Sequence, residues 1–182
     1  MDLPDNAEKK FSGIIFDVYH YEQELYDGTK ATFEKLKRAT TLQTLGIVGD
    51  KIIIVKDSQP HRETMWSLPG GRIEEREDDL TGAQREFMEE TGFESQTWTP
   101  LRTYSPYNKI DWEIKIFLAR DCKKTTEPEP DAGEKIELHL VDFDEFIDIV
   151  CADKFHDHQF ANEVLRMRVN GKLDILKKEI FA

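Results

Sequence analysis

The sequence predicts an α/β fold of the α+β type, in which helices sandwich a mixed sheet. Three observations carry this prediction. An apolar strand pair surrounds Gly49-Asp50, an amphipathic helix begins near Asp79, and further strands and amphipathic helices follow that helix. A chain of 182 residues is long enough to bury a substantial core as one domain with a small appendage.

Residues 1–38 predict an N-terminal antiparallel β extension of this domain. β-branched and aromatic residues are mixed from Phe11 to Lys37, and Asp27-Gly28 supplies a hairpin turn within that stretch. We therefore divide the chain into an extension of residues 1–38 and a main domain of residues 39–182.

The elements of the main domain follow from hydrophobic periodicity. Strands are expected at 40–48 and 51–56, the second of which holds the unbroken apolar run Ile52 to Val55 of a buried strand. Polar residues predict loops at 58–64 and 122–133. Further strands are expected at 96–104, 111–121 and 136–140, and further helices after an Asp142 cap, at 159–169 and at 173–180.

Composition excludes several classes of partner. The formal net charge is -12, whereas nucleic acids and anionic membranes attract basic surfaces, so neither is an expected partner. No apolar run approaches the length of a membrane span, and the amino terminus carries no secretory leader, so a cytoplasmic location is expected. Cys122 and Cys151 are widely separated and are expected as free thiols.

Three glutamates on the helix near Asp79 form the strongest candidate site. On a helical wheel of about 100° per residue, Glu86, Glu89 and Glu90 share one patch, which is separate from the apolar residues of the helix. Like charges at this spacing repel one another, so the patch makes best sense around a cation, and oxygen donors suit Mg²⁺ or Mn²⁺. Arg85, one turn before Glu89, is expected to orient the carboxylates.

A solvated acidic helix face is the competing interpretation of this patch, and the flanking residues decide between the two. Gly71, then Glu77 after five residues, then Arg85-Glu86-Phe87-Met88-Glu89-Glu90-Thr91-Gly92-Phe93 after seven more, resembles a complete Nudix box. No required position departs from that pattern. The resemblance implies the Nudix α/β/α sandwich, with a mixed central sheet.

The Nudix resemblance also implies a chemistry and its residues. Proteins similar to this one cleave a nucleoside diphosphate linked to another group, using metal-bound carboxylates to place water against phosphorus. It implies a Mg²⁺ site, with Mn²⁺ as the alternative, held by Glu86, Glu89 and Glu90, with the Gly71 carbonyl as a further candidate. Glu77 would support the loop or an additional ion, and Arg85 would orient the ligands.

The general base is expected to be either Glu86, within the box, or Glu134, which enters the last strand after the acidic loop. For Glu134, a solvated loop end is an equally good interpretation. Aromatic candidates for contact with the substrate are Trp66, Tyr104, Tyr107 and Trp112. For Trp66, packing in the core is favoured over a role as a wall of the site.

The amino-terminal sheet and the later Gly133 to Leu138 segment resemble the ADP-ribose pyrophosphatase branch of the family. That branch often dimerises through its amino-terminal sheet, so a homodimer is expected; the alternative is a sheet that merely extends one monomer. The substrate would be ADP-ribose or another nucleotide sugar, and the stretch before the box and the position of Pro106 keep GDP-mannose and UDP-glucose open. Alternatives are a nucleoside triphosphate pyrophosphohydrolase and a non-catalytic nucleotide sensor.

Overall fold

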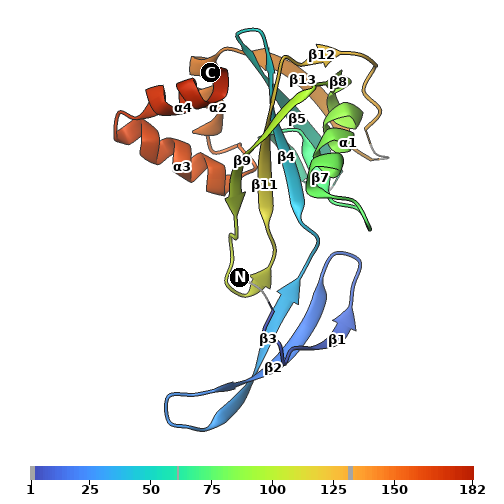
Figure 1. Cartoon of the computed structure of the whole chain (residues 1–182), viewed down its shortest axis with the longest axis vertical. Helices are drawn as coiled ribbons and strands as arrows, with labels where there is room; N and C mark the ends of the chain where they lie inside the picture. The colour runs from blue at the N-terminus through green and yellow to red at the C-terminus, as the bar shows by residue number, and fades with distance from the viewer. Residues whose placement is uncertain (1–2, 61, 131–132) are drawn as a thin grey trace.

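A computed structural model describes residues 3–60, 62–130 and 133–182. It shows a layered main body from which the amino-terminal strands extend at one end (Figure 1). This arrangement matches the fold predicted from the sequence, including the β extension. Within the described residues, no helix combines the length and apolar character needed to cross a membrane.

The extension is an antiparallel sheet of β1 (Glu8–Ser12), β2 (Asp17–Glu24) and β3 (Lys30–Lys37). The predicted turn at Asp27-Gly28 joins β2 to β3, and Gly28 has the positive φ of 82° that such a turn favours. The short β10 (Ile110–Asp111) pairs in parallel with β3 and so ties the extension to the main body.

The central sheet is mixed, as predicted. Its order is β13 (Lys135–Val141), β5 (Lys51–Gln59), β4 (Thr41–Val48), β11 (Ile114–Arg120) and β9 (Thr97–Tyr104). The pairing of β11 with β4 is parallel, whereas the other pairings along this path are antiparallel. Two further strands join the sheet: β6 (Arg62–Ser67) pairs with β5, and β7 (Gly70–Arg72) pairs with β4.

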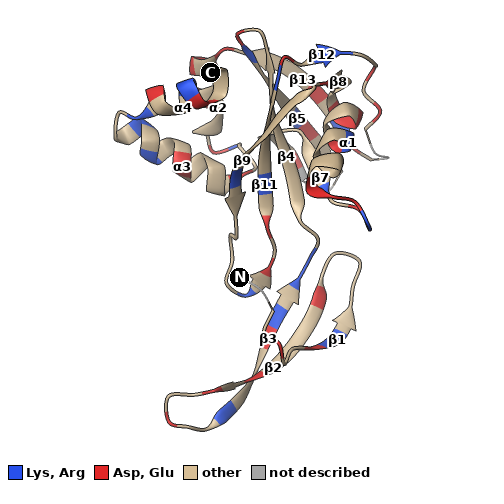
Figure 2. Cartoon of the chain, viewed as in Figure 1, with Lys and Arg blue, Asp and Glu red and all other residues tan. Residues whose placement is uncertain are grey.

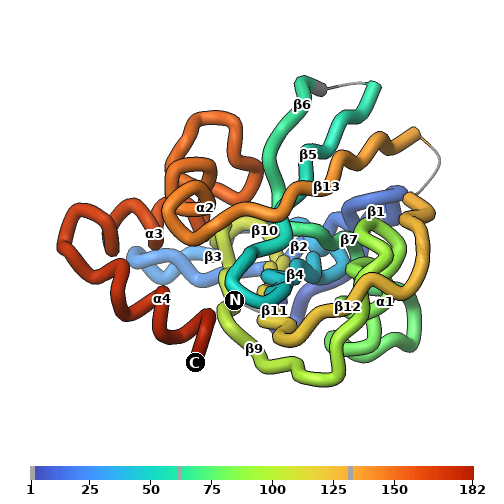
Figure 3. The backbone as a smooth tube through the Cα atoms, turned by 90° about the horizontal axis from the view of Figure 1, so that it is seen from above, coloured from blue at the N-terminus to red at the C-terminus, as the bar shows by residue number. Residues whose placement is uncertain are grey.

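Helices cover both faces of this sheet. Successive side chains of β5 point to opposite faces and show which helices lie on each. Ile52 and Ile54 pack into a core with α2 (Phe143–Val150), α3 (His158–Val169) and α4 (Leu173–Phe181), whereas Ile53 packs against Phe87 of α1 (Asp79–Thr91). Figure 3 shows α1 on one side of the strands and the three other helices across from it. A strand buried on both faces explains the unbroken apolar run in β5.

Two loop predictions need correction. Residues 58–64 are not a loop throughout, because β5 continues to Gln59 and β6 begins at Arg62, which makes a long hairpin. Polar residues suit this hairpin because its end projects from the sheet beyond the core. Within 122–133, β12 (Lys123–Lys124) pairs with β8 (Phe93–Glu94), and residues 131–132 lie outside the described part. Cys122 and Cys151 are free, as expected.

Candidate active site

Helix α1 presents its glutamates in a fixed orientation because both of its ends and its apolar face are anchored. The carboxylate of Asp78 accepts hydrogen bonds from the Leu80 and Thr81 amides, and Gly92 ends the helix with a φ of 71°. Phe87 is fully buried, so the opposite face points away from the core. Figure 2 shows that acidic residues also gather in the loop between β7 and α1.

Arg85 donates hydrogen bonds to several carboxylates in and beside the glutamate patch. Its Nε and Nη2 donate to the two oxygens of Glu77 at 3.0 and 3.1 Å, and its Nη1 donates to Glu86 at 2.9 Å and to Glu89 at 3.0 Å. The Glu77 carboxylate also accepts from the Glu74 amide at 3.0 Å. Glu77 therefore supports the loop, one of the two roles expected of it, and Arg85 orients three carboxylates at once.

Glu90 lies apart from this network and is the most buried of the glutamates. Only 8% of the residue is exposed, and its carboxylate accepts a 2.8 Å hydrogen bond from the Gly70 amide. Burial raises the pKa of Glu90 well above its usual value, and the nearby carboxylates of Glu86, Glu134 and Asp57 raise it further. A buried carboxyl among three others is a place where a cation would remove an electrostatic cost.

Gly71 touches the carboxylate of Glu86. A Cβ added at Gly71 would lie 2.4 to 2.5 Å from the carboxylate atoms of Glu86, much closer than van der Waals contact. The absence of a side chain therefore lets Glu86 lie directly against the backbone of β7, where the Gly71 carbonyl was predicted to help hold a metal.

Replacing Gly71 with alanine is expected to push the Glu86 carboxylate aside and lower turnover at least about tenfold, since small displacements of reacting groups are costly. The free energy of unfolding should change little, because the obstructed atoms end a flexible side chain. Gly49→Ala is the matched control: its φ of 60° is strained for alanine, yet nothing lies within 4 Å. That control should cost about 1 kcal/mol of stability and no activity. Equal activity of both variants would contradict this role of Gly71.

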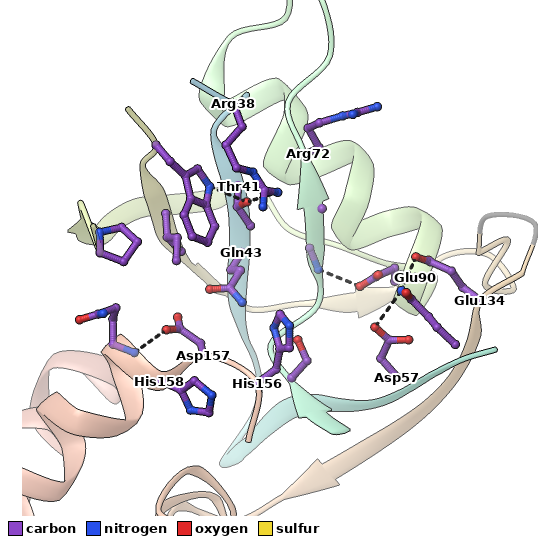
Figure 4. A pocket seen from close by; sticks show the side chains of 18 of the residues that line it. Arg38, Thr41, Gln43, Asp57, Arg72, Glu90, Glu134, His156, Asp157 and His158 are labelled. Atoms are coloured by element: carbon purple, nitrogen blue, oxygen red, sulfur yellow. Dashed lines mark hydrogen bonds between the residues drawn. The ribbon is translucent and has the colours of Figure 1, made fainter. Parts of the chain in front are cut away.

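A cavity of about 400 Å³ opens beside Glu90. Figure 4 shows Glu90, Glu134 and Asp57 gathered on one side of it. Glu134 accepts a 2.9 Å hydrogen bond from Gln59, so it is positioned by β5 and is not a solvated loop end. On another side the cavity is lined by Arg38 and by residues from two segments that approach it from other parts of the chain: Pro106, Tyr107, Trp112, His156, Asp157, His158 and Gln159.

The cavity gathers some of the predicted site residues and leaves others out. Gly71, Glu90, Glu134, Tyr107 and Trp112 line it. Glu86 borders it through its contact with Gly71, whereas Glu77, Arg85 and Glu89 form the adjoining network.

Two of the predicted aromatic contacts, Trp66 and Tyr104, lie elsewhere. Trp66 packs against the core beneath Lys56, whose Nζ is 4.7 Å from the centre of its ring, as the packing interpretation expected. The Tyr104 hydroxyl donates to Glu163 at 2.6 Å, which explains why that side chain faces α3. We therefore retain only Tyr107 and Trp112 as candidates for substrate contact.

Trp112 and Tyr107 form an aromatic wall. Their rings stack with centroids 6.2 Å apart, and the Arg38 guanidinium lies 4.4 Å from the centre of the Trp112 ring. Burial lowers the pKa of Arg38, and the positive charge of Arg72 lowers it further. Such a wall can receive a flat or anionic part of a ligand.

The oxygen donors of this site fit a divalent cation, although they do not form a finished ligand set. Among the described residues, no three acidic, histidine or cysteine side chains are grouped as a metal site. Arg85 instead holds Glu86 and Glu89 by hydrogen bonds. A cation beside Gly71 would compete with Arg85 for these oxygens and would relieve the repulsion at Glu90.

Sequence reasoning missed several residues of the cavity, namely Arg38, Gln43, Asp57, Gln59, Arg72 and the 156–159 segment. They come from the residue stretch before β4, from β4, β5 and β7, and from the segment that leads into α3, all of which are distant along the chain. Within that segment, His156 and His158 are both exposed. The buried polar residue Gln43 within an apolar strand was a usable signal.

A NUDIX domain model matches residues 42–163, which include the whole glutamate patch and most of the cavity. The chain belongs to the Nudix family. This match confirms the resemblance drawn from the box and places this hydrolase among enzymes that generally use divalent metals.

Two relatives match nearly the whole Nudix chain. It is 27% identical to "ADP-ribose pyrophosphatase" of Bacillus subtilis (strain 168), over 93% of this chain and 94% of that one. It is 28% identical to "Methanol dehydrogenase activator" of Bacillus methanolicus, over 92% of both. The solved structure "Crystal structure of ADP compounds hydrolase" matches the fold, with a TM-score of 0.72 and 20% identity over 92% of this chain and 95% of that one. The first of these relatives supports the ADP-ribose pyrophosphatase-like branch, and the solved structure supports the fold.

Proposed function

We propose that this Nudix hydrolase is a Mg²⁺-dependent pyrophosphatase of a nucleoside diphosphate sugar, with ADP-ribose as the leading substrate. Water would cleave the bond between the two phosphates and release a nucleoside monophosphate and a sugar phosphate. The observation that carries the proposal is the burial of Glu90 among Glu86, Glu134 and Asp57 at the wall of an open cavity. An acidic wall can accept a pyrophosphate only if a cation offsets the charge.

Each residue of the site has a place in this chemistry. Glu86, Glu89 and Glu90, with the Gly71 carbonyl, would hold Mg²⁺ or Mn²⁺, which supplies charge neutralisation and acidifies a water. Arg85 keeps Glu86 and Glu89 aligned, and Glu77 holds Arg85. The chemistry then depends on positioning and on stabilising charge, the main demands of phosphoryl transfer.

Glu134 is our candidate for the general base, with Glu86 as the alternative. Glu134 lines the cavity, raises the pKa of Glu90, and is held by Gln59. It can therefore lie close to a water that approaches the phosphate without being engaged by Arg85. Glu86 already uses its Oε1 to accept a hydrogen bond from Arg85, so one of its two oxygens is engaged.

The substrate assignment draws support from the full-length relative named for ADP-ribose and from the aromatic wall. Trp112 and Tyr107 offer π surfaces for a base or sugar, and Arg38 offers a positive charge for a phosphate. These contacts suit ADP-ribose, GDP-mannose and UDP-glucose alike.

Hydrolysis of a substrate panel tests the proposal. ADP-ribose, GDP-mannose, UDP-glucose, a diadenosine polyphosphate and nucleoside triphosphates would be incubated with Mg²⁺, with Mn²⁺ and with chelator, and the products identified. We expect AMP and ribose 5-phosphate from ADP-ribose, loss of activity in chelator, and recovery on adding Mg²⁺. Release of pyrophosphate from triphosphates would favour the housecleaning alternative. Tight nucleotide binding without turnover would favour the sensor.

The extension of residues 1–38 is proposed as the dimerisation element of a cytoplasmic homodimer, and residues 39–182 as the hydrolase domain. Large apolar side chains on and beside the strands of the extension are exposed, with Phe11 at 63%, Ile14 at 95% and Ile15 at 53%. An exposed apolar group of this kind is typical of an interaction surface. Sedimentation should give twice the chain mass, and Ile14→Asp should shift it to the monomer.

A further inference from the structure

Gln43 and Asp157 leave two buried acceptor oxygens in the wall of the cavity. Gln43 is 5% exposed and Asp157 is 4% exposed. No described residue is hydrogen-bonded to Gln43 Oε1 or to Asp157 Oδ2. Leaving a buried acceptor unpaired costs about 1–3 kcal/mol, so two in one cavity require an explanation. Figure 4 shows both side chains directed into the cavity, across from Glu90.

The two residues are held in place by strong local structure. Gln43 lies within β4, where Leu42 and Leu45 are fully buried. Asp157 is the N-cap of α3, and its Oδ1 accepts from the Gln159 and Phe160 amides at 3.0 and 3.1 Å. The cap uses one carboxylate oxygen and leaves Oδ2 available, so capping alone does not account for this acidic residue.

The distance of Gln43 from the glutamates indicates which part of a substrate this side chain would contact. Gln43 is the cross-strand partner of Gly70, whose amide donates to Glu90. Neighbouring strands lie about 5 Å apart, so Gln43 is one strand away from the carboxylate cluster. In a nucleotide sugar the group at that distance from the pyrophosphate is a sugar ring, whereas the base lies farther away.

We propose that Gln43 and Asp157 form an acceptor subsite for the vicinal hydroxyls of a sugar attached to the pyrophosphate. Two adjacent hydroxyl groups supply two donors, one for each oxygen. Both oxygens are shielded from water in the structure, so the contact needs a small side-chain adjustment, common on ligand binding, that leaves the Asp157 cap in place. The inference rests on the proposed function for its choice of ligand, and it adds a means of selecting the sugar.

Binding of paired products tests the subsite without requiring turnover. Ribose 5-phosphate and 2-deoxyribose 5-phosphate form one pair, and AMP and 2′-deoxy-AMP form the other. Each would be titrated calorimetrically into the full chain with Mg²⁺. The pairs also separate the two sources of a diol, the distal sugar and the nucleoside ribose. We expect the hydroxylated member of one pair to bind about tenfold more tightly, the value of one good hydrogen bond.

Two variants and a control assign that preference to the named residues. Asp157→Asn keeps a good capping oxygen but replaces the free acceptor with a donor, and Gln43→Leu removes the other acceptor at similar volume. Each should reduce the preference to about twofold. Asp142→Asn is the matched control, because Asp142 caps α2 through the Glu145 amide and lies outside the cavity lining.

The outcomes separate the subsite from the reaction. Equal binding of both members in both pairs, no binding of any of the four, or a preference that survives in both variants would overturn the subsite. A preference lost in Asp157→Asn and Gln43→Leu but kept in Asp142→Asn supports it. A panel that shows no pyrophosphatase activity would remove the proposed reaction while leaving the binding result valid.

Discussion

Glu90→Gln is expected to lower turnover at least about a hundredfold while the fold stays intact. Residues that merely support a metal ligand typically contribute 10- to 100-fold, so a proposed ligand should contribute no less. Glutamine has almost the same volume, and its carbonyl oxygen can still accept from the Gly70 amide. The steady-state rate with saturating Mg²⁺ measures the effect, and circular dichroism checks the fold.

In the metal-free protein, Glu90→Gln should raise the stability, although it lowers turnover. Burial raises the pKa of Glu90, so this carboxyl contributes stability below its unfolded pKa of about 4 and loses that contribution as the pH rises. Glutamine carries no such titration. In chelator at neutral pH, Glu90→Gln should therefore melt at a higher temperature than the wild type, and the difference should shrink toward pH 4.

Glu94→Gln serves as the control for Glu90→Gln, because Glu94 is exposed and lies three residues beyond the end of α1. Its activity and melting temperature should match those of the wild type. Full Mg²⁺-dependent activity in Glu90→Gln would sink the assignment of the site, and an unchanged pH dependence of melting would show that the buried carboxyl is not the source of the electrostatic cost.

Local patterns were sufficient to predict most of the fold. Several signals lie within a few residues of one another, and the structure confirms them: the hairpin at Asp27-Gly28, the helix start near Asp79, the cap at Asp142, and the apolar run from Ile52 to Val55. The extension of β5 and β6 beyond the core was missed because strand pairing can continue through polar residues where no apolar pattern marks it.

The site was predictable where it lies along one helix and unpredictable where it joins distant segments. Glu86, Glu89 and Glu90 share a helical face, so spacing alone placed them together. Gln43 and Asp157 lie more than a hundred residues apart, and they meet at one cavity because the segment before α3 pairs with Trp66 of β6. Tyr104, an aromatic residue predicted to contact the substrate, donates to Glu163 and lies outside the cavity lining.

Arg85→Lys is expected to lower turnover about 10- to 100-fold, because a single ammonium cannot reproduce the fork that aligns three carboxylates. Lysine keeps the charge, so the loss would report geometry. Stability should also fall, by about 1–2 kcal/mol after allowing for solvent around these partly exposed groups. The hydrogen bonds from Arg85 lower the pKa of Glu77, so this contribution is present at neutral pH and fades as the pH drops below about 4.

Arg102→Lys is the control for Arg85→Lys. It distinguishes a general loss of stability from a loss of glutamate alignment at the site. Arg102 also bridges two glutamates, donating to Glu163 at 2.7 Å and to Glu179 at 2.8 Å, but it does so beside α3 and α4, outside the cavity lining. This variant should lose a similar amount of stability and keep its activity at temperatures below its melting transition. If both arginine variants lose activity equally, then Arg85 acts only through overall stability. If Arg85→Lys alone loses activity, the arginine is needed to hold the glutamates in their reactive orientation.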